Sequence, residues 1–377
     1  MRVLIAFDKF KDALSAQQAG EVAAQALLVR HPDWQFDLCP LTDGGEGFCE
    51  TLCRGIAGRI EPIKVRGPRG AIVSAPVGFV SAASLPGAAQ QQLAFTGTLA
   101  VAGLASASGY ELLPREQRDP WQTTTLGTGE LLRHAARGKA GAILLGLGGS
   151  ATNDLGLGAL AALGFRFLNA AGAEITVPTP SIWESITRID RSGASAMPPI
   201  FIAGDVTNPL LGPRGATATF GPQKGLSRED VPRLETQAAR MAALLCEACG
   251  QPLSLADTPG TGAAGGIGFG LMVAFGAKLV PGFDLVSAWL DLPARLAAAD
   301  LVITGEGRFD ATSLGGKGPG RLVTAARRLG KPVHVFAGSL GLPADEHLHA
   351  ITPAGLPLAE ALPRTAEFLA AAVARAL

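Results

Sequence analysis

Five glycines, two hydroxyls, an amide and a carboxylate fall within one short stretch of this chain, GLGGSATNDLGLG at residues 146–158. An apolar run precedes the stretch and a helix-like pattern follows it. Glycine in mid-chain costs backbone entropy, so the cluster indicates a strained turn or a backbone that another group approaches closely. Backbone amides where a helix begins bind anions. We therefore expect an anion at this turn.

Lysines and carboxylates also occur in the polar stretches that follow other apolar runs, and several of these stretches are rich in glycine. The candidates are Asp8, Lys9, Lys11, Asp43, Glu46, Asp205, Asn208, Lys224, Glu306, Arg308 and Lys317. The chain has only eight lysines, and four of them lie in these stretches. Lysine is a compact point charge suited to phosphate, and carboxylates beside it are what a magnesium-bound nucleotide needs. The set predicts phosphoryl transfer.

Short apolar runs alternate with helical patterns along the chain. Strands are predicted for RVLIAF, QFDLCPL, GAILLGLG, PIFIAGD, DLVITGEG and PVHVFAGS, and helices for residues 15–30, 123–138 and 320–330. This order predicts parallel sheets with helices on both faces, which bind ligands beyond the carboxyl ends of their strands. Residues 60–97 instead have the pattern of a hairpin, which indicates that a second domain is inserted there.

Composition limits the partners. With 32 basic and 32 acidic residues, the chain has no net charge that would attract nucleic acid or an anionic membrane surface. Its 377 residues, 47% of them apolar, fit a large core and two domains. The apolar run before Asp8 is too short for a signal or membrane-spanning segment. We expect a cytoplasmic protein with a small-molecule substrate.

Each feature also has an interpretation without phosphoryl transfer. A single Gly-rich turn between a strand and a helix is often only tight packing. The spacing G-x-G-x-x-G at Gly260, Gly262 and Gly265 does not follow a strand, which disfavours a nicotinamide dehydrogenase, and no G-x-x-x-x-G-K-[ST] motif occurs. A non-catalytic protein that binds sugar acids stays open, although it would not need carboxylates beside lysines.

The five cysteines allow a further alternative. Cys246 and Cys249 form C-x-x-C, and Cys49 and Cys53 are one helical turn apart, so a four-thiolate zinc site is formally possible. Both pairs lie in helix-like sequence without turn residues between them. Cysteines buried in the core are the better interpretation.

Eight phrases give the chain a family resemblance. They are FDKFKDALSA, TDGGEG, TTTLGTGELL, GLGGSATND, GDVTNPLLGP, FGPQKG, GTGAAGGIG and LVITGEGRFD. In this order, from residue 3 to about residue 340, the chain resembles the bacterial type I glycerate kinases. The resemblance implies two three-layer α/β/α domains with mostly parallel sheets and the active site in the cleft. One domain, 1–60 with 286–377, would contain both chain ends, and the other, 61–285, would be inserted and flavodoxin-like.

The resemblance also implies ATP-dependent phosphorylation of D-glycerate, with 2-phosphoglycerate as the favoured product. Phosphorylation at O3, a related small hydroxy acid as substrate, and a monomeric or homodimeric state stay open. The chain departs from the family pattern at Lys9, Asp12 and Gly315, where serine, glycine and histidine are usual. A histidine role in the 305–317 stretch is therefore excluded, but no carboxylate or lysine that the reaction needs is lost.

We assign the roles as a hypothesis. Asp205 would accept the hydroxyl proton, and Lys9 and Lys317 would stabilise the transferring group of ATP. Mg²⁺ would be held by Asp43, Glu46 and Glu306. Arg308 suits the substrate carboxylate, because its planar fork binds carboxylates in a bidentate manner. Phosphate or glycerate oxygens would be bound by Lys11, Gly148, Gly149, Ser150, Thr152, Asn153, Asp154, Asn208 and Lys224, with Arg308.

Overall fold

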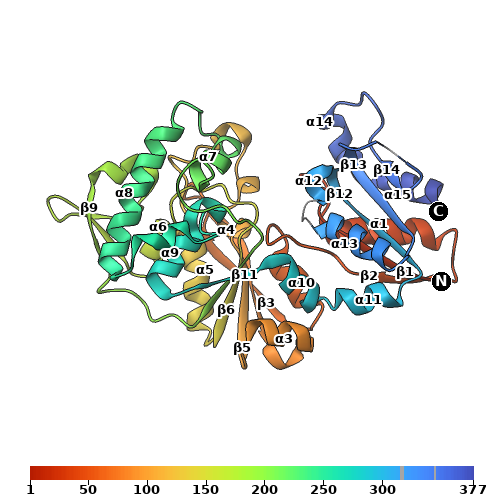
Figure 1. Ribbon diagram of the computed structural model, residues 1–377, viewed down its shortest axis with the longest axis horizontal. Helices are drawn as coiled ribbons and strands as arrows, with labels where there is room; N and C mark the ends of the chain where they lie inside the picture. Colours follow the sequence, from red (N-terminus) through yellow and green to blue (C-terminus); the bar gives the residue numbers. More distant parts are fainter. Residues whose placement is uncertain (315–317, 344) are drawn as a thin grey trace. The chain divides into compact units, whose positions relative to one another are not determined.

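The computed structural model describes residues 1–314, 318–343 and 345–377, and the chain forms two compact α/β units (Figure 1). The first unit comprises residues 1–43 and 283–377, and the second comprises residues 44–282. The sequence placed these boundaries at 60/61 and 285/286. Residues 44–60 belong to the second unit because α2 (Phe48–Arg54) packs against strands β4 (Ile72–Ser81) and β5 (Thr98–Gly103) of that unit.

The first unit has a parallel sheet. Its strands are β1 (Arg2–Phe7), β2 (Gln35–Leu38), β12 (Leu301–Phe309), β13 (Val333–Leu340) and β14 (Leu348–Ala350). They lie in the order β14-β13-β12-β1-β2, and each pair is parallel. Counted within the unit, this is the 2-1-3-4-5 order of flavodoxin-like folds. The flavodoxin-like order that we expected in the inserted domain therefore belongs to the unit formed by the chain ends.

Helices from opposite ends of the chain pack together on this sheet. Helix α1 (Ala16–Leu28) begins at a capping box, in which Ser15 Oγ accepts a hydrogen bond from Gln18 N, and it contacts α15 (Thr365–Ala376). Ile5 of β1 shares a core cluster with residues of both helices, whereas its neighbour Leu4, which points to the other face, is also buried. The sheet is thus covered on both faces. Further helices of the unit are α10 (Gly282–Trp289), α11 (Leu292–Ala298), α12 (Ala311–Leu314), α13 (Gly318–Arg328) and α14 (Leu358–Ala361).

The second unit has a mixed sheet in the order β11-β10-β6-β5-β4-β3. Its strands are β3 (Arg59–Arg66), β4 (Ile72–Ser81), β5 (Thr98–Gly103), β6 (Ala142–Gly146), β10 (Ile200–Gly204) and β11 (Lys278–Pro281). Strands β5, β6, β10 and β11 are parallel, and β3, β4 and β5 are antiparallel. The predicted hairpin is β3–β4, and α3 (Gly87–Leu93) follows it. A small antiparallel sheet contains β7 (Arg166–Asn169), β8 (Glu174–Ile175) and β9 (Ile186–Asp190).

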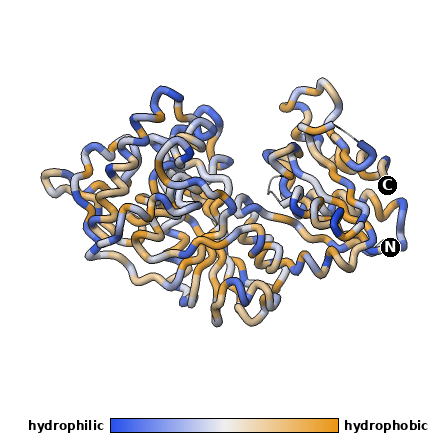
Figure 2. Tube along the Cα trace, viewed as in Figure 1, coloured by the Kyte–Doolittle hydropathy of each residue, from blue (hydrophilic) through white to orange (hydrophobic). Residues whose placement is uncertain are grey.

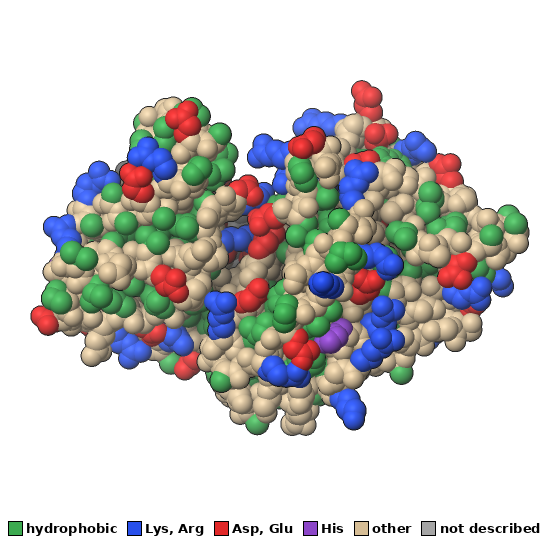
Figure 3. All heavy atoms as spheres, turned by 180° about the vertical axis from the view of Figure 1, so that it is seen from behind, with side chains coloured by type: hydrophobic (Ala, Val, Ile, Leu, Met, Phe, Trp, Pro, Cys, Tyr) green, Lys and Arg blue, Asp and Glu red, His purple; other side chains and the backbone are tan. Residues whose placement is uncertain are grey.

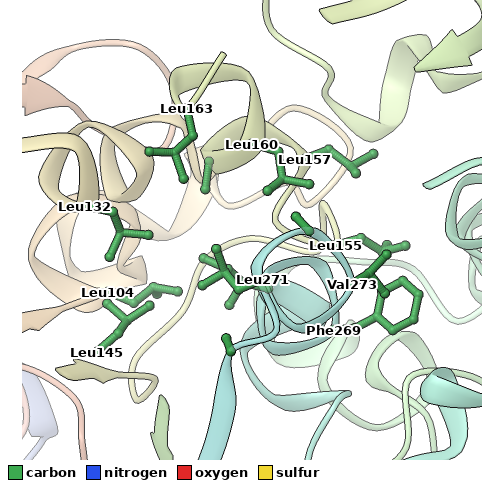
Figure 4. Packing of buried hydrophobic residues seen from close by; sticks show 14 of the residues in the cluster. Leu104, Leu132, Leu145, Leu155, Leu157, Leu160, Leu163, Phe269, Leu271 and Val273 are labelled. Carbon is green, nitrogen blue, oxygen red and sulfur yellow. The ribbon is translucent and has the colours of Figure 1, made fainter. Parts of the chain in front are cut away.

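The core of the second unit is formed where its helices meet the sheet. In Figure 4, leucines of α5 (Leu126–Arg137), α6 (Leu157–Ala162), β6 and adjoining loops surround α9 (Ile267–Phe275), whose Phe269, Leu271 and Val273 are buried. Figure 2 colours the strands of the mixed sheet largely as hydrophobic. The helices are α2, α3, α4 (Ala105–Ser108), α5 (Leu126–Arg137), α6 (Leu157–Ala162), α7 (Ala216–Phe220), α8 (Val231–Cys249) and α9 (Ile267–Phe275).

The surface mixes both signs of charge. On the face drawn in Figure 3, acidic and basic side chains are interspersed, as expected from their equal numbers in the sequence. None of the helices in the described residues is both long enough and apolar enough to span a membrane.

Candidate active site

Two neighbouring strands of the first unit end in buried carboxylates. Asp8 follows β1, and its N–H donates to Gly305 O of β12 at 2.9 Å, next to Glu306. The side chains of Asp8 and Glu306 are only 7% and 8% exposed. Burial, and then the negative charge of Asp43, raises the pKa of Asp8 to about 7. The charge of Glu306 also raises the pKa of Asp8, so the three carboxylates lie near one another. They lie at the edge of the sheet where the strand order predicts a ligand.

A lysine lies beside these carboxylates. Lys9 Nζ donates to Asp43 Oδ1 at 3.4 Å, and the Lys9 charge opposes the rise in the pKa of Asp8. Lys11 is exposed two residues further along the chain. The first unit therefore brings together Lys9, Asp43 and Glu306, as the sequence hypothesis requires, and adds Asp8, to which that hypothesis gave no role.

Arg308 is an exposed residue near the end of β12. Its Nε donates to Asp310 Oδ2 at 3.1 Å, and its side chain is 70% exposed. Hydrogen bonds from Thr312, with a further one from Arg308, lower the pKa of Asp310 to about 2. Arg308 is therefore available to an anion, but Asp310 competes for it. The predicted residues Gly315 and Lys317 lie outside the described residues.

The glycines of the second unit permit close backbone contact between two loops. Gly148 N donates to Gly44 O at 2.8 Å, and a Cβ on Gly148 would overlap Gly45. Gly149 has φ +71°, and a Cβ there would overlap Glu46 Oε1. The glycine cluster thus has a structural cause, which is the approach of the 44–46 loop to the start of the 148–154 turn. This approach places the Glu46 carboxylate against the turn.

The polar side chains of the 148–154 turn are buried rather than exposed. Asp154 Oδ2 accepts from Thr125 N at 2.7 Å and Thr125 Oγ1 at 2.9 Å, and its two oxygens also accept from the N–H groups of Gly156 and Gly158. Asn153 Nδ2 donates to Thr217 Oγ1 at 3.0 Å, while Asn153 Oδ1 is a buried acceptor with no hydrogen-bond partner among the described residues. Burial raises the pKa of Asp154, and its four donors work against that rise. These contacts give Asp154 a structural role at the start of α6.

Asp205 is exposed directly after β10, at the carboxyl edge of the mixed sheet. Asn208 lies three residues further along the chain, and its Nδ2 donates to Arg214 O at 2.7 Å. The backbone carbonyl oxygen of Asn208 accepts from Gly260 N and Gly262 N. The GDVTNPLLGP and GTGAAGG phrases are therefore joined by backbone contacts. The G-x-G-x-x-G spacing serves close packing before α9, as its sequence context indicated.

Lys224 is the residue whose placement differs most from the sequence hypothesis. It ends the 3-10 helix η5 (Pro222–Lys224), and its side chain is only 2% exposed. Its Nζ donates to Thr152 O at 2.6 Å and to Ser150 Oγ at 3.3 Å. Lys224 therefore contacts the 148–154 turn from inside the protein.

Comparisons with known proteins identify the family of the chain. The family model described as "Glycerate kinase family" matches residues 3–377. The chain belongs to the glycerate kinase family. It is 37% identical to "Glycerate kinase" of Bacillus subtilis (strain 168), over 98% of this chain and 95% of that protein. It is 38% identical to "Glycerate 2-kinase" of Escherichia coli (strain K12), over 90% of this chain and 86% of that protein.

A solved structure is similar throughout. The crystal structure of a candidate glycerate kinase 2 from Salmonella typhimurium LT2 is 39% identical, has a TM-score of 0.76, and matches over 100% of this chain and 96% of that chain. These matches confirm the α/β fold and the family that the eight phrases indicated. Glycerate kinases are phosphotransferases that act on an alcohol group, so the chain is an enzyme of that class.

Thiolate zinc binding does not fit the cysteines of this kinase. All five cysteines are buried and unpaired by disulfides, and Cys49 and Cys53 pack against Gly78 within the second unit. Across the described ranges, no group of three or more His, Cys, Asp or Glu side chains is placed to hold a metal alone. That finding is compatible with Mg²⁺, which proteins bind through one or two carboxylates together with substrate phosphates.

A pocket adjoins Glu46 in the second unit. It measures about 380 Å³ and is lined by residues 45–50, which include the start of α2, and by residues of β4, β5 and α4. Glu46, Glu50 and Glu111 make its wall acidic. Such a wall suits a neutral or cationic group better than a phosphate.

Proposed function

We propose that this protein transfers the γ-phosphoryl group of ATP to a hydroxyl of D-glycerate, giving ADP and 2-phosphoglycerate. The match to the glycerate kinase family along residues 3–377 carries the proposal. The choice of product rests on the name of the Escherichia coli relative, which is a glycerate 2-kinase. A 3-phosphoglycerate product, or a related small hydroxy acid as substrate, is the alternative.

In the first unit, we assign the charged groups at the sheet edge to the phosphates of ATP. Lys9 and Lys11, with Lys317, supply positive charge to the transferring group, whose transition state spreads negative charge over its oxygens. Asp43 and Glu306 are hard oxygen ligands beside the buried Asp8, and this crowding of carboxylates fits a divalent cation. Arg308 is exposed and planar, so it suits the glycerate carboxylate.

In the second unit, we assign the proton transfer to Asp205. The glycerate oxygen forms a bond to the γ-phosphorus while the bond from that phosphorus to the β–γ bridging oxygen breaks, and ADP leaves. The hydroxyl proton passes to the Asp205 carboxylate, which is exposed and therefore accessible. Glu46 is the unit's candidate ligand for Mg²⁺. When bound, the ion would neutralise charge on the β- and γ-phosphates.

The 148–154 turn divides into two parts under this proposal. The backbone amide of Gly149, with the hydroxyls of Ser150 and Thr152, binds substrate or phosphate oxygens, whereas the Gly148 amide donates to Gly44 O within the protein. Asn153, Asp154, Asn208 and Lys224 hold the turn and its surroundings in place, because their side chains bond to the protein itself. A cytoplasmic location and a monomeric or homodimeric state belong to the same proposal.

Product analysis tests the proposal. The purified protein is incubated with ATP, Mg²⁺ and D-glycerate, and the phosphorus NMR spectrum is compared with authentic 2- and 3-phosphoglycerate. We expect the 2-phosphoglycerate signal and an equal amount of ADP. A 3-phosphoglycerate signal would overturn the regiochemistry alone. Unchanged ATP with folded protein would overturn the choice of substrate, and other hydroxy acids would then be tried.

A further inference from the structure

Lys224 is a buried cation that donates to backbone and hydroxyl oxygens rather than to a carboxylate. Its bonds go to Thr152 O and Ser150 Oγ, both in the 148–154 turn. Lysine is almost never fully buried unless it is paired, because removing an ammonium group from water is costly. A side chain in this position therefore needs a reason beyond packing.

The rest of the turn is fixed by neutral groups. Ser150 Oγ also lies 3.2 Å from Ala264 O, Ala151 N donates to Ser108 O at 2.9 Å, and Gly149 O accepts from Tyr110 N at 3.0 Å. The turn would keep most of its shape from these bonds alone. To these neutral bonds Lys224 adds a group that can carry a positive charge.

We propose that Lys224 is a positioning residue that places a proton-dependent positive charge behind the 148–154 turn, so that the turn binds an anionic substrate more tightly when Lys224 is protonated than when it is neutral. This inference rests on the proposed function, in which the turn binds substrate or phosphate oxygens. It concerns the regulation of that site by pH and does not make Lys224 a ligand.

The surroundings of Lys224 allow its proton to leave near neutral pH. Burial lowers the pKa of Lys224 to about 7, and the Asp154 carboxylate acts in the opposite direction. Asp154, on the turn itself, is the titratable group that faces Lys224, and no other charged side chain of the described residues contributes to this shift. Burial raises the pKa of Asp154 as well, and the four hydrogen bonds that its carboxyl accepts oppose that rise.

Loss of the proton removes charge without releasing the turn. A neutral amine keeps two N–H groups, which are enough for the bonds to Thr152 O and Ser150 Oγ. The expected effect is therefore on the binding of anions and not on the fold.

Three variants separate the positive charge of Lys224 from its hydrogen bonds to the turn. K224R keeps a permanent charge, K224Q keeps a donor without charge, and K224M keeps neither.

Steady-state kinetics of the full chain test the inference. KM and kcat for D-glycerate and for ATP are measured from pH 6 to pH 9. For the wild type, we expect the KM of one of these anions to rise about tenfold over this range, with a midpoint near pH 7 and a smaller change in kcat. In K224Q, that KM should be high at every pH, and in K224R it should stay low. Persistence of the same rise in K224Q, or a flat wild-type profile, overturns the inference.

NMR of the lysine side chains provides a readout that does not depend on turnover. In protein labelled with ¹³C at lysine Cε, eight signals are expected, and the one absent from K224M belongs to Lys224. It should titrate near pH 7, and the added anion, D-glycerate or ADP, should raise its midpoint because binding and protonation are linked. A midpoint above pH 9, or one that neither anion moves, contradicts the inference. If an anion shifts the titration of Lys224 but the wild type does not phosphorylate D-glycerate, the proposed function is overturned instead.

Discussion

At the scale of single residues, Asp205 is the general base that we propose. It lies exposed at the carboxyl end of β10, next to the backbone of Gly282. Asp205→Asn keeps the shape of the side chain but cannot accept a proton. We expect kcat with D-glycerate to fall about 10²-fold or more, with a thermal midpoint close to that of the wild type.

Asp257 provides the matched control for this variant. It is an exposed aspartate of the same unit, at the end of the 3-10 helix η6 (Leu253–Asp257), and has no role in the proposal. Asp257→Asn should leave kcat within about twofold of the wild type. If Asp205→Asn loses less than about tenfold while the fold holds, Asp205 is not the base.

Lys224 also predicts how stability depends on pH. Its pKa is about 7 in the folded protein and near the ordinary 10.5 in the unfolded chain, so the unfolded chain binds more protons between these values. Stability therefore rises with pH across this window, by at most about 1.4 kcal/mol per pH unit. In urea unfolding at pH 7, 8 and 9, the free energy of unfolding of the wild type should increase relative to that of K224M. K64M, which removes an exposed lysine, should show no such trend relative to the wild type.

At the scale of elements, the 148–154 turn can be tested by paired glycine substitutions. Gly149 and Gly172 both have positive φ, of +71° and +78°, so alanine strains the backbone at either position. A Cβ on Gly149 would displace the Glu46 carboxylate, whereas nothing lies within 4 Å of one on Gly172. Gly149→Ala should lower kcat/KM about 10²-fold, as a misplacement of roughly 1 Å can. Gly172→Ala should lose only stability, about 1 kcal/mol, and an equal loss of activity in both variants would contradict the prediction.

Sequence patterns predicted the elements better than the environments of their side chains. The strands β1, β6 and β10 lie where apolar runs were found, because a strand buried on both faces has a continuous apolar sequence. Strand β14 was not predicted, since its three residues, Leu348–Ala350, form no recognisable run. Burial of Lys224 and Asp154 could not be predicted either, because their hydrogen-bond donors and acceptors come from segments far apart in sequence.

At the scale of the whole molecule, the order of the strands was the part of the fold that local patterns could not give. Strand β1 pairs with β12, where Val3 lies opposite Leu301, and no pattern within either strand specifies that pairing. A change from βαβ units to a hairpin marked the insertion, but the hairpin begins only after α2. The first boundary between the two units therefore lies at 43/44, earlier in the chain than the pattern indicated. The flavodoxin-like strand order arises because the segments before and after the insertion join in one sheet.

The same organisation predicts that residues 44–282 fold as an isolated fragment. Both of its ends lie against β10, because a Cβ on Gly44 would be 3.4 Å from Ala203 O and one on Gly282 would be 3.1 Å from Gly204 N. Excision therefore leaves the mixed sheet and its core cluster intact. We expect a cooperative urea transition by circular dichroism, and no phosphorylation of D-glycerate, because Lys9, Lys11 and Glu306 belong to the other unit. A fragment without a cooperative transition would mean that its core depends on the segments formed by the chain ends.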